Sequence, residues 1–290
     1  MRYPLLRAMR PKQWVKNVFV LAAMFFDARI LDPVALLKSI AAFAVFCAIS
    51  SAIYLVNDLV DIENDRAHPT KRRRPLASGA LQPKVAQIAA AALALGGLLL
   101  ALLVDLKLLW VALAYLAVMM LYNYKLKHTV ILDVMTVAFG FVLRVYAGAV
   151  VVVVARFSPW LYVCTTLLAL FIAINKRRHE LVLLQQDANN HRAILEEYSV
   201  RFLDEMTSLV TATTLAAYSF YTFSAPNLPA NHSMMFTIPF VMYGIFRYLY
   251  LIHVRRLGGS PEEIVLSDRP LLVSILLWAL TAGLALYWPW

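Results

Sequence analysis

The segment SIAAFAVFCAISSAIYLVNDLVDIEND, residues 39–65, decides the fold class of this chain. Residues 39–56 are uncharged and mostly apolar, and a helix needs about 20 such residues to cross the hydrocarbon core of a membrane. Residues 57–65 then carry four acidic side chains and no basic one. The segment therefore predicts a membrane-spanning helix that ends in an acidic cluster.

The rest of the chain repeats the apolar pattern. Of its 290 residues, 62% are hydrophobic and 15% are charged, which is too apolar for a soluble globular protein. Apolar runs predict nine helices, at about residues 17–31, 36–57, 84–104, 107–124, 131–154, 159–175, 206–225, 234–251 and 270–288. We therefore expect an all-α, polytopic membrane protein with nine transmembrane helices that forms a single integral membrane domain, residues 1–290.

The distribution of basic residues predicts the orientation in the membrane. A net charge of +10 would suggest a nucleic-acid partner in a soluble protein, but here Lys and Arg lie between apolar runs, as topology signals do. If every run crosses, most Lys and Arg fall on one side of the membrane. Those expected near the other side are only Arg29, Lys38, Lys107 and Arg156. We expect an inner (plasma) membrane protein with a cytoplasmic N-terminus, an outside C-terminus and no nucleic-acid partner.

The acidic cluster has the spacing of one helix face. Asp58, Asp61 and Asp65 are three and four residues apart, and Asn57 lies one turn before Asp61. Carboxylates held so closely repel one another unless they bind a hard cation such as Mg²⁺, which completes its shell with phosphate oxygens of a substrate. The sequence predicts a magnesium site here; the plainer alternative is a solvated acidic helix end.

A basic loop follows the acidic face. Residues 68–79 read His-Pro-Thr-Lys-Arg-Arg-Arg-Pro-Leu-Ala-Ser-Gly, with four consecutive cations from Lys71 to Arg74. Metal and cations together suit a diphosphate, because Mg²⁺ bridges its oxygens and Lys or Arg takes the remaining ones. A loop that only sets topology would explain the charge but not its closeness to Asp65.

Two other places carry candidate phosphate ligands. Lys16 precedes the first span, where Trp14 is equally expected to anchor the chain at the headgroups. Lys176 and Arg177 follow the sixth span, where a topological anchor is an equal alternative. Residues 176–205 have the pattern of an amphipathic helix at the cytoplasmic interface.

The fifth span carries a charge deep in the membrane. Arg144 lies about 16 Å beyond Asp133 along a helix and on the same face. Charges at such depth usually face a polar cavity, so Arg144 is expected to bind an anion, with an ion pair to an acid of a neighbouring span as the alternative. Gly140 and Gly148 flank it at four-residue spacing and are expected to allow close helix approach.

Taken together, these motifs resemble the UbiA superfamily of membrane prenyltransferases, and within it most closely the decaprenyl-phosphate phosphoribosyltransferase branch. The points of resemblance are Arg10-Pro11-Lys12-Gln13-Trp14-x-Lys16-Asn17, the NDxxDxxxD pattern from Asn57 to Asp65, the Lys71 to Gly79 loop, Tyr122…Lys125-Leu126-Lys127, Asp133…Gly140-Phe141-Val142-Leu143-Arg144, Ser158-Pro159-Trp160 and Lys176-Arg177-Arg178. They cover most of the first 200 residues.

The resemblance implies a fold, a reaction and a set of site residues. The fold would be a nine-helix bundle around a cytoplasm-facing, laterally open cavity, and the reaction would be Mg²⁺-assisted transfer of 5-phosphoribose from phosphoribosyl diphosphate to a polyprenyl (decaprenyl-type) phosphate. Catalytic roles fall to Asp58, Asp61 and Asp133, and metal ligation to Asn57, Asp58, Asp61 and Asp65. Substrate binding falls to Lys16, Asn57, Lys71, Arg74, Tyr122, Lys125, Arg144, Lys176 and Arg177.

One departure bears on the donor. Prenyl-transferring relatives carry a second motif, DxxxD, whereas Asp133 is followed here by Val137 at the place of the second Asp. This argues against a prenyl diphosphate donor, although a prenyltransferase of the same superfamily remains the nearest alternative. A transporter is a more distant one, and assembly into a homo-oligomer is left open.

Overall fold

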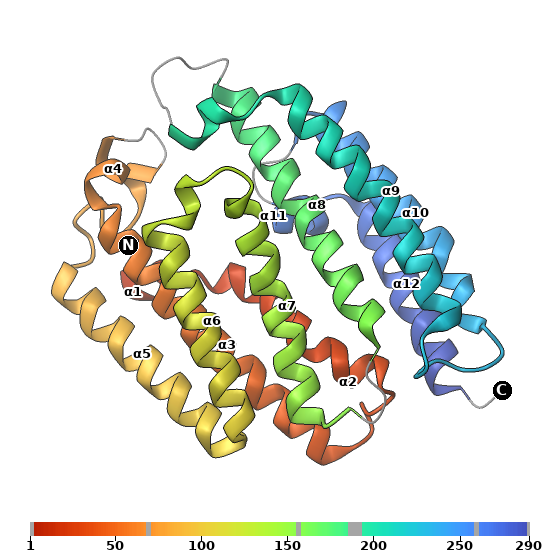
Figure 1. Cartoon of the computed structure of the whole chain (residues 1–290). Coiled ribbons are helices and arrows are strands. Elements are labelled where there is room, and N and C mark those ends of the chain that lie inside the picture. The colour runs from red at the N-terminus through yellow and green to blue at the C-terminus, as the bar shows by residue number, and fades with distance from the viewer. Residues whose placement is uncertain (1–2, 68–70, 155–157, 185–192, 258–260, 289–290) are drawn as a thin grey trace. The chain divides into compact units, whose positions relative to one another are not determined.

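The computed structural model describes residues 3–67, 71–154, 158–184, 193–257 and 261–288, and in these residues all regular structure is helical (Figure 1). Helices occur at all nine places that the apolar runs indicated. By length and composition, seven helices of the described residues can cross a membrane: Pro33–Val60, Pro83–Val104, Leu106–Tyr124, Leu132–Val152, Pro159–Val182, Ser233–His253 and Arg269–Tyr287. The all-α membrane fold is thus confirmed, while the number of nine crossings stays a prediction.

The chain divides into two compact units, which we describe separately. Unit 1 comprises Met1–Phe25, Arg29–Leu126 and Leu143–Val154, and unit 2 comprises Phe26–Ala28, Lys127–Val142 and Ala155–Trp290. The prediction of a single domain over residues 1–290 is not tested by this division.

Unit 1 is built around α3 (Pro33–Val60), which packs against α5 (Pro83–Val104) and α6 (Leu106–Tyr124). In Figure 1, α5 and α6 are neighbouring antiparallel helices, joined at Asp105, whose side chain accepts a 2.7 Å hydrogen bond from the Lys107 N–H. The buried core between these helices includes Phe46, Ile49 and Leu108. Burial of the apolar face of α3 against α5 and α6 therefore fixes the helix that carries the acidic cluster.

The first predicted span is not a regular α-helix. It consists of a 3₁₀ helix, η1 (Pro11–Leu21), followed by the short α2 (Ala22–Phe26). A 3₁₀ helix has three residues per turn, and accordingly Val15 and Val18 are exposed while Asn17 and Val20 are buried. Lys12 shares the exposed face, whereas Lys16 shares the half-buried face of Gln13, so the two lysines do not point the same way as they would on an α-helix.

A glycine makes the close approach to η1 possible. Gly148 lies on α7 (Leu132–Val152), and an added Cβ there would sit 1.9 Å from the carbonyl oxygen of Val20. The backbones of η1 and α7 therefore touch at this point, which confirms the close approach that the sequence predicted for Gly148.

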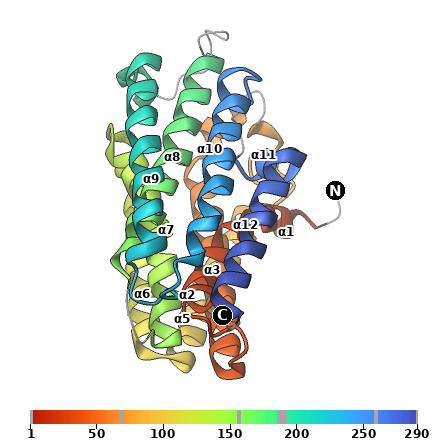
Figure 2. The same ribbon diagram turned by 90° about the vertical axis from the view of Figure 1, so that its right-hand side faces the viewer.

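In the part of unit 2 that the structure describes, four long helices run alongside one another (Figure 2). They are α8 (Pro159–Leu184), α9 (Val200–Ser224), α10 (Ile238–His253) and α12 (Arg269–Tyr287). Helix α8 packs on α9, and α10 packs on α12. The shorter elements are η4 (Ala193–Glu197), η5 (Ser233–Thr237) and α11 (Pro261–Ser267). The amphipathic helix expected over 176–205 is replaced by the end of α8, η4 and the start of α9, and part of that range lies outside the described residues.

Candidate active site

The acidic cluster of unit 1 brings two carboxylates to one place. Asp58 lies in the last turn of α3 and Asp65 in α4 (Ile62–Ala67), and they are only 2% and 4% exposed. Nη1 of Arg74 donates to Oδ1 of Asp58 at 3.2 Å and to Oδ2 of Asp65 at 2.7 Å. The guanidinium of Arg74 therefore pairs with both carboxylates, and buried acids need such a positive partner.

Asp61 and Asn57 lie at the break between α3 and α4. Asp61 caps α3 with φ −94° and ψ 11°, and its N–H donates to the Asn57 carbonyl at 3.0 Å. Both side chains are half-buried. The helical hydrogen bonds continue through this break, because the Asp65 N–H donates to the Asp61 carbonyl at 2.8 Å, and Arg74 joins the side chains of Asp58 and Asp65.

Sequence reasoning gave no role to Arg10, which the structure places at the centre of this cluster. Its Nη2 donates to Oδ1 of Asp58, and its guanidinium lies 5.0 Å from the centre of the Tyr54 ring. Arg10 has φ 55° between α1 (Pro4–Ala8) and η1, a left-handed conformation that is uncommon outside glycine. No local pattern in the sequence indicates such a turn.

The basic loop turns one cation inward and three outward. Lys71, Arg72 and Arg73 form the exposed η2 (Lys71–Arg73), whereas Arg74 reaches the acids. The next residues hold the loop in place, because Leu76 and Leu81 are buried in an apolar cluster of unit 1. His68, which begins the quoted loop, lies outside the described residues.

The described residues contain no group of three or more His, Cys, Asp or Glu side chains close enough to hold a metal ion. The donor chemistry of the cluster nevertheless fits a hard divalent cation, because two buried carboxylates already share one positive group. Arg10 and Arg74 supply the counter-charge in this structure.

Arg144 is the buried cation of α7, and it is 6% exposed. Its Nε donates to Oδ1 of Asn17 at 2.8 Å and its Nη2 to the Tyr115 hydroxyl at 2.7 Å. Asn17 in turn donates to Sγ of Cys47 and Oγ of Ser50, both at 3.3 Å. Since Ser50 precedes Asp58 by eight residues on α3, Arg144 is held roughly 12 Å along that helix from the acidic pair.

A second charged cluster lies in unit 2. Asp133 is fully buried at the start of α7, and its Oδ2 accepts a 2.5 Å hydrogen bond from Nε of Arg177. Oδ1 of Asp133 accepts a 2.7 Å hydrogen bond from the Tyr198 hydroxyl. Arg177 also donates through Nη1 to Oε2 of Glu180 at 2.5 Å. Both oxygens of Asp133 therefore accept hydrogen bonds within this cluster. Tyr198 belongs to the cluster although the sequence analysis did not identify it as a site residue.

The remaining predicted residues are placed individually. Tyr122 and Lys176 are half-buried on α6 and α8, and Lys125 is exposed just after α6. Val137, at the place of the missing acid, packs against the apolar core of unit 2.

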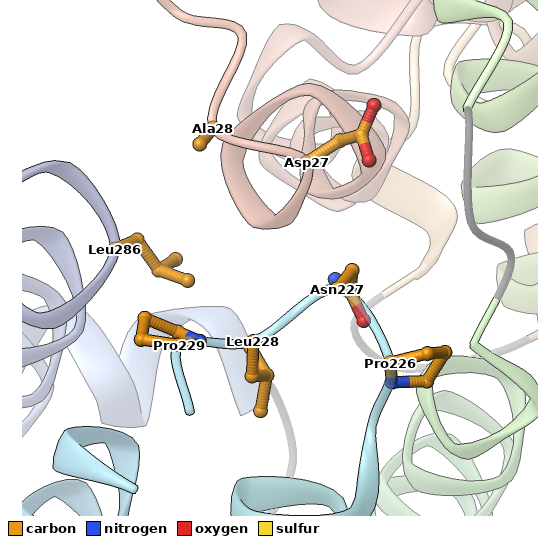
Figure 3. A pocket seen from close by; sticks show the side chains of 7 residues that line it. All are labelled: Asp27, Ala28, Pro226, Asn227, Leu228, Pro229 and Leu286. Carbon is orange, nitrogen blue, oxygen red and sulfur yellow. The ribbon is translucent and has the colours of Figure 1, made fainter. Parts of the chain in front are cut away.

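A pocket of about 410 Å³ lies elsewhere in unit 2 (Figure 3). Its lining residues are Asp27, Ala28, Pro226, Asn227, Leu228, Pro229 and Leu286. None of them was predicted for the site, and the only charged one is an acid, so this pocket does not suit a phosphate group.

Comparison with known proteins identifies the family to which the chain is similar. Residues 17–262 match the UbiA prenyltransferase family. The decaprenyl-phosphate phosphoribosyltransferase of Mycolicibacterium smegmatis is 34% identical, over 98% of this chain and 92% of the relative. The enzyme of the same name from Corynebacterium glutamicum is 35% identical, over 98% and 86%. A UbiA homolog from Archaeoglobus fulgidus bound to GPP and Mg²⁺ superposes with a TM-score of 0.74 at 18% identity, covering 98% of this chain and 99% of that one.

Proposed function

This chain belongs to the UbiA prenyltransferase family, and on that premise we propose that it transfers 5-phosphoribose from phosphoribosyl diphosphate to a polyprenyl phosphate of the decaprenyl type and releases diphosphate. The observation that carries the proposal is the similarity to decaprenyl-phosphate phosphoribosyltransferases over 98% of the chain. The buried acids and cations of unit 1 support it, because they suit a diphosphate leaving group.

Asp58 and Asp65, with Asn57 and Asp61 beside them, are the residues that would hold Mg²⁺ in this proposal. When bound, the ion supplies charge neutralisation to the departing diphosphate. Arg10 and Arg74 would then release the carboxylates and bind oxygens of the diphosphate instead. Arginine suits this task because its planar guanidinium binds either carboxylate or phosphate through paired hydrogen bonds.

The donor and the acceptor bring further phosphates that need cations. The candidates are Lys16, Lys71, Lys125, Lys176, Arg177 and the deeper Arg144, with Tyr122 as a hydrogen-bonding group. Transfer passes through a positively charged anomeric carbon, which an already ionised lipid phosphate attacks, so positioning and charge stabilisation supply most of the rate.

The role of Asp133 is narrowed by its contacts. The resemblance implies a catalytic role for Asp133, which would be to orient a ribose hydroxyl or to stabilise the developing cation. Because both of its oxygens accept hydrogen bonds within the chain, we assign it to the placement of Arg177. Val137 stands where the DxxxD motif would have its second Asp, which favours a phosphoribosyl donor over a prenyl diphosphate.

The membrane arrangement completes the proposal. It comprises nine crossings of the inner (plasma) membrane, a cytoplasmic N-terminus, an outside C-terminus and a cavity open to the cytoplasm and to lipid. The distribution of Lys and Arg supports this orientation. A homo-oligomer is compatible with it.

Incubation of the purified protein with two labelled donors tests the proposed reaction. Phosphoribosyl diphosphate and polyprenyl phosphate are expected to give a lipid-linked pentose phosphate with Mg²⁺, and none after chelation. Transfer from a prenyl diphosphate instead, with no product from phosphoribosyl diphosphate, would replace this function by that of a prenyltransferase. Absence of transfer from either donor would remove both functions and leave a transporter to be tested by flux.

Removing Arg74 is expected to raise the affinity for a divalent metal ion in the absence of substrate. In Arg74→Gln, Asp58 and Asp65 lose a competing cation, so Mn²⁺ should bind about fivefold more tightly, as a lost charge interaction of roughly 1 kcal/mol implies. Inorganic diphosphate should then improve Mn²⁺ binding less than in the wild type. Titration followed by electron paramagnetic resonance measures both effects.

The matched control is Arg72→Gln, because Arg72 is exposed in the same loop. It should bind Mn²⁺ like the wild type. Weaker binding in Arg74→Gln than in this control would contradict the exchange of partners.

A further inference from the structure

Tyr198 joins two parts of unit 2 through its hydroxyl group. The hydroxyl donates to Oδ1 of Asp133 at 2.7 Å and accepts a hydrogen bond from the N–H of Ile131 at 2.8 Å. Tyr198 lies between η4 and α9, whereas Ile131 and Asp133 lie at the start of α7. One side-chain atom therefore fixes both the backbone and the carboxylate at this helix start.

The backbone that Tyr198 holds is strained. Ile131 has φ 69°, a left-handed conformation that is an outlier for a β-branched residue. Such conformations persist where surrounding contacts impose them, and they occur often at functional sites. The Ile131 N–H is directed at Tyr198 by this turn, and Asp133 follows two residues later, so the strain and the carboxylate position are linked.

The other side of Asp133 leads to a substrate-binding candidate. Its Oδ2 accepts from Nε of Arg177, which also donates to Glu180. The single O–H of Tyr198 is thus donated to the carboxylate that orients the Arg177 guanidinium. Burial, and then the hydrogen bond to Asp133, raise the pKa of Tyr198 to about 12, so the hydroxyl keeps its proton at neutral pH.

We propose that Tyr198 is a positioning residue of the transfer reaction, which acts through Asp133 to orient Arg177 toward a phosphate group of a substrate. The inference rests on the proposed function. The alternative is that the hydrogen bond from Tyr198 to Asp133 only stabilises unit 2 and has no effect on the reaction.

Tyr198→Phe separates the two roles, because it removes the hydroxyl and keeps the ring that packs on Phe202. Loss of one partner of a buried charge is expected to lower kcat/KM for phosphoribosyl diphosphate by about 10- to 100-fold. The control is Tyr218→Phe, since Tyr218 is also buried in unit 2 and its hydroxyl bonds Thr237 and Trp278. The control should lose thermal stability to a similar extent but lose activity less than about twofold.

A double-mutant cycle with Asp133→Asn identifies the route of the effect. If Tyr198 acts through Asp133, Tyr198→Phe should change kcat/KM by less than about twofold in the Asp133→Asn background. Arg177→Lys replaces Asp133→Asn in the cycle should the latter not accumulate in membranes. If the losses of kcat/KM multiply in the cycle, or if Tyr198→Phe and Tyr218→Phe lose equal activity, the positioning role is overturned. The proposed function still stands in that case, provided that the wild-type protein transfers phosphoribose. A wild-type protein without transfer would instead show that the proposed function itself is wrong.

Discussion

Asp58→Asn is expected to reduce phosphoribosyl transfer about a thousandfold or more, with normal insertion into the membrane. Asp58 is 2% exposed and its Oδ1 accepts hydrogen bonds from Arg10 and Arg74. An amide cannot replace the charge of that oxygen, so the divalent ion loses a ligand and two guanidinium groups lose their partner. Electrostatic stabilisation of a leaving group is often the largest single contribution to catalysis. Initial rates in vesicles, over a range of Mg²⁺ concentrations, measure the loss.

The matched control is Glu63→Gln, which removes a carboxylate from the same acidic segment. Glu63 is exposed and pairs with the exposed Arg66, so its loss should change the rate less than about twofold. Wild-type turnover in Asp58→Asn at limiting Mg²⁺ would show that the buried carboxylate is not part of the metal site.

Gly148→Ala is expected to give the largest loss of stability. The added Cβ would lie 1.9 Å from the Val20 carbonyl oxygen, and backbone cannot yield as a flexible side chain does. Separating η1 from α7 also disturbs the hydrogen bond between Asn17 and Arg144. We expect the free energy of unfolding to fall by roughly 2–4 kcal/mol, measured by thermal unfolding in detergent.

Gly96→Ala serves as the comparison for this change. Apart from the adjacent backbone of α5 itself, no atom lies within 4 Å of a Cβ added at Gly96, and alanine favours a helix more than glycine does. Its unfolding temperature should stay equal or rise. If Gly148→Ala unfolded at the same temperature as Gly96→Ala, the backbone contact between η1 and α7 would not support the fold.

The positions of the helices could be predicted from sequence because lipid imposes a simple rule. Within the hydrocarbon core a helix satisfies its own backbone hydrogen bonds, and it needs a long run of apolar side chains to lie there. Runs such as 36–57 and 84–104 therefore match α3 and α5 within a few residues. The first run was harder, because its burial repeats every three residues around Asn17 and Val20, and an α-helical period does not describe it.

The candidate site was only partly predictable. Spacing brought Asp58 and Asp65 to notice, and the structure joins them through Arg74. The role of Arg10 depends on a left-handed turn, and that of Tyr198 on a contact with a helix 65 residues earlier in the chain. Neither follows from local sequence, because long-range packing determines both.

A diffraction measurement at the manganese absorption edge tests the metal site most directly. Crystals of the protein with Mn²⁺ and phosphoribosyl diphosphate should show an anomalous peak bound by carboxylate oxygens of Asp58 and Asp65. Arg10 and Arg74 should have moved from these acids to the diphosphate. A peak located elsewhere, with Asp58 still bonded to both arginines, would contradict the account.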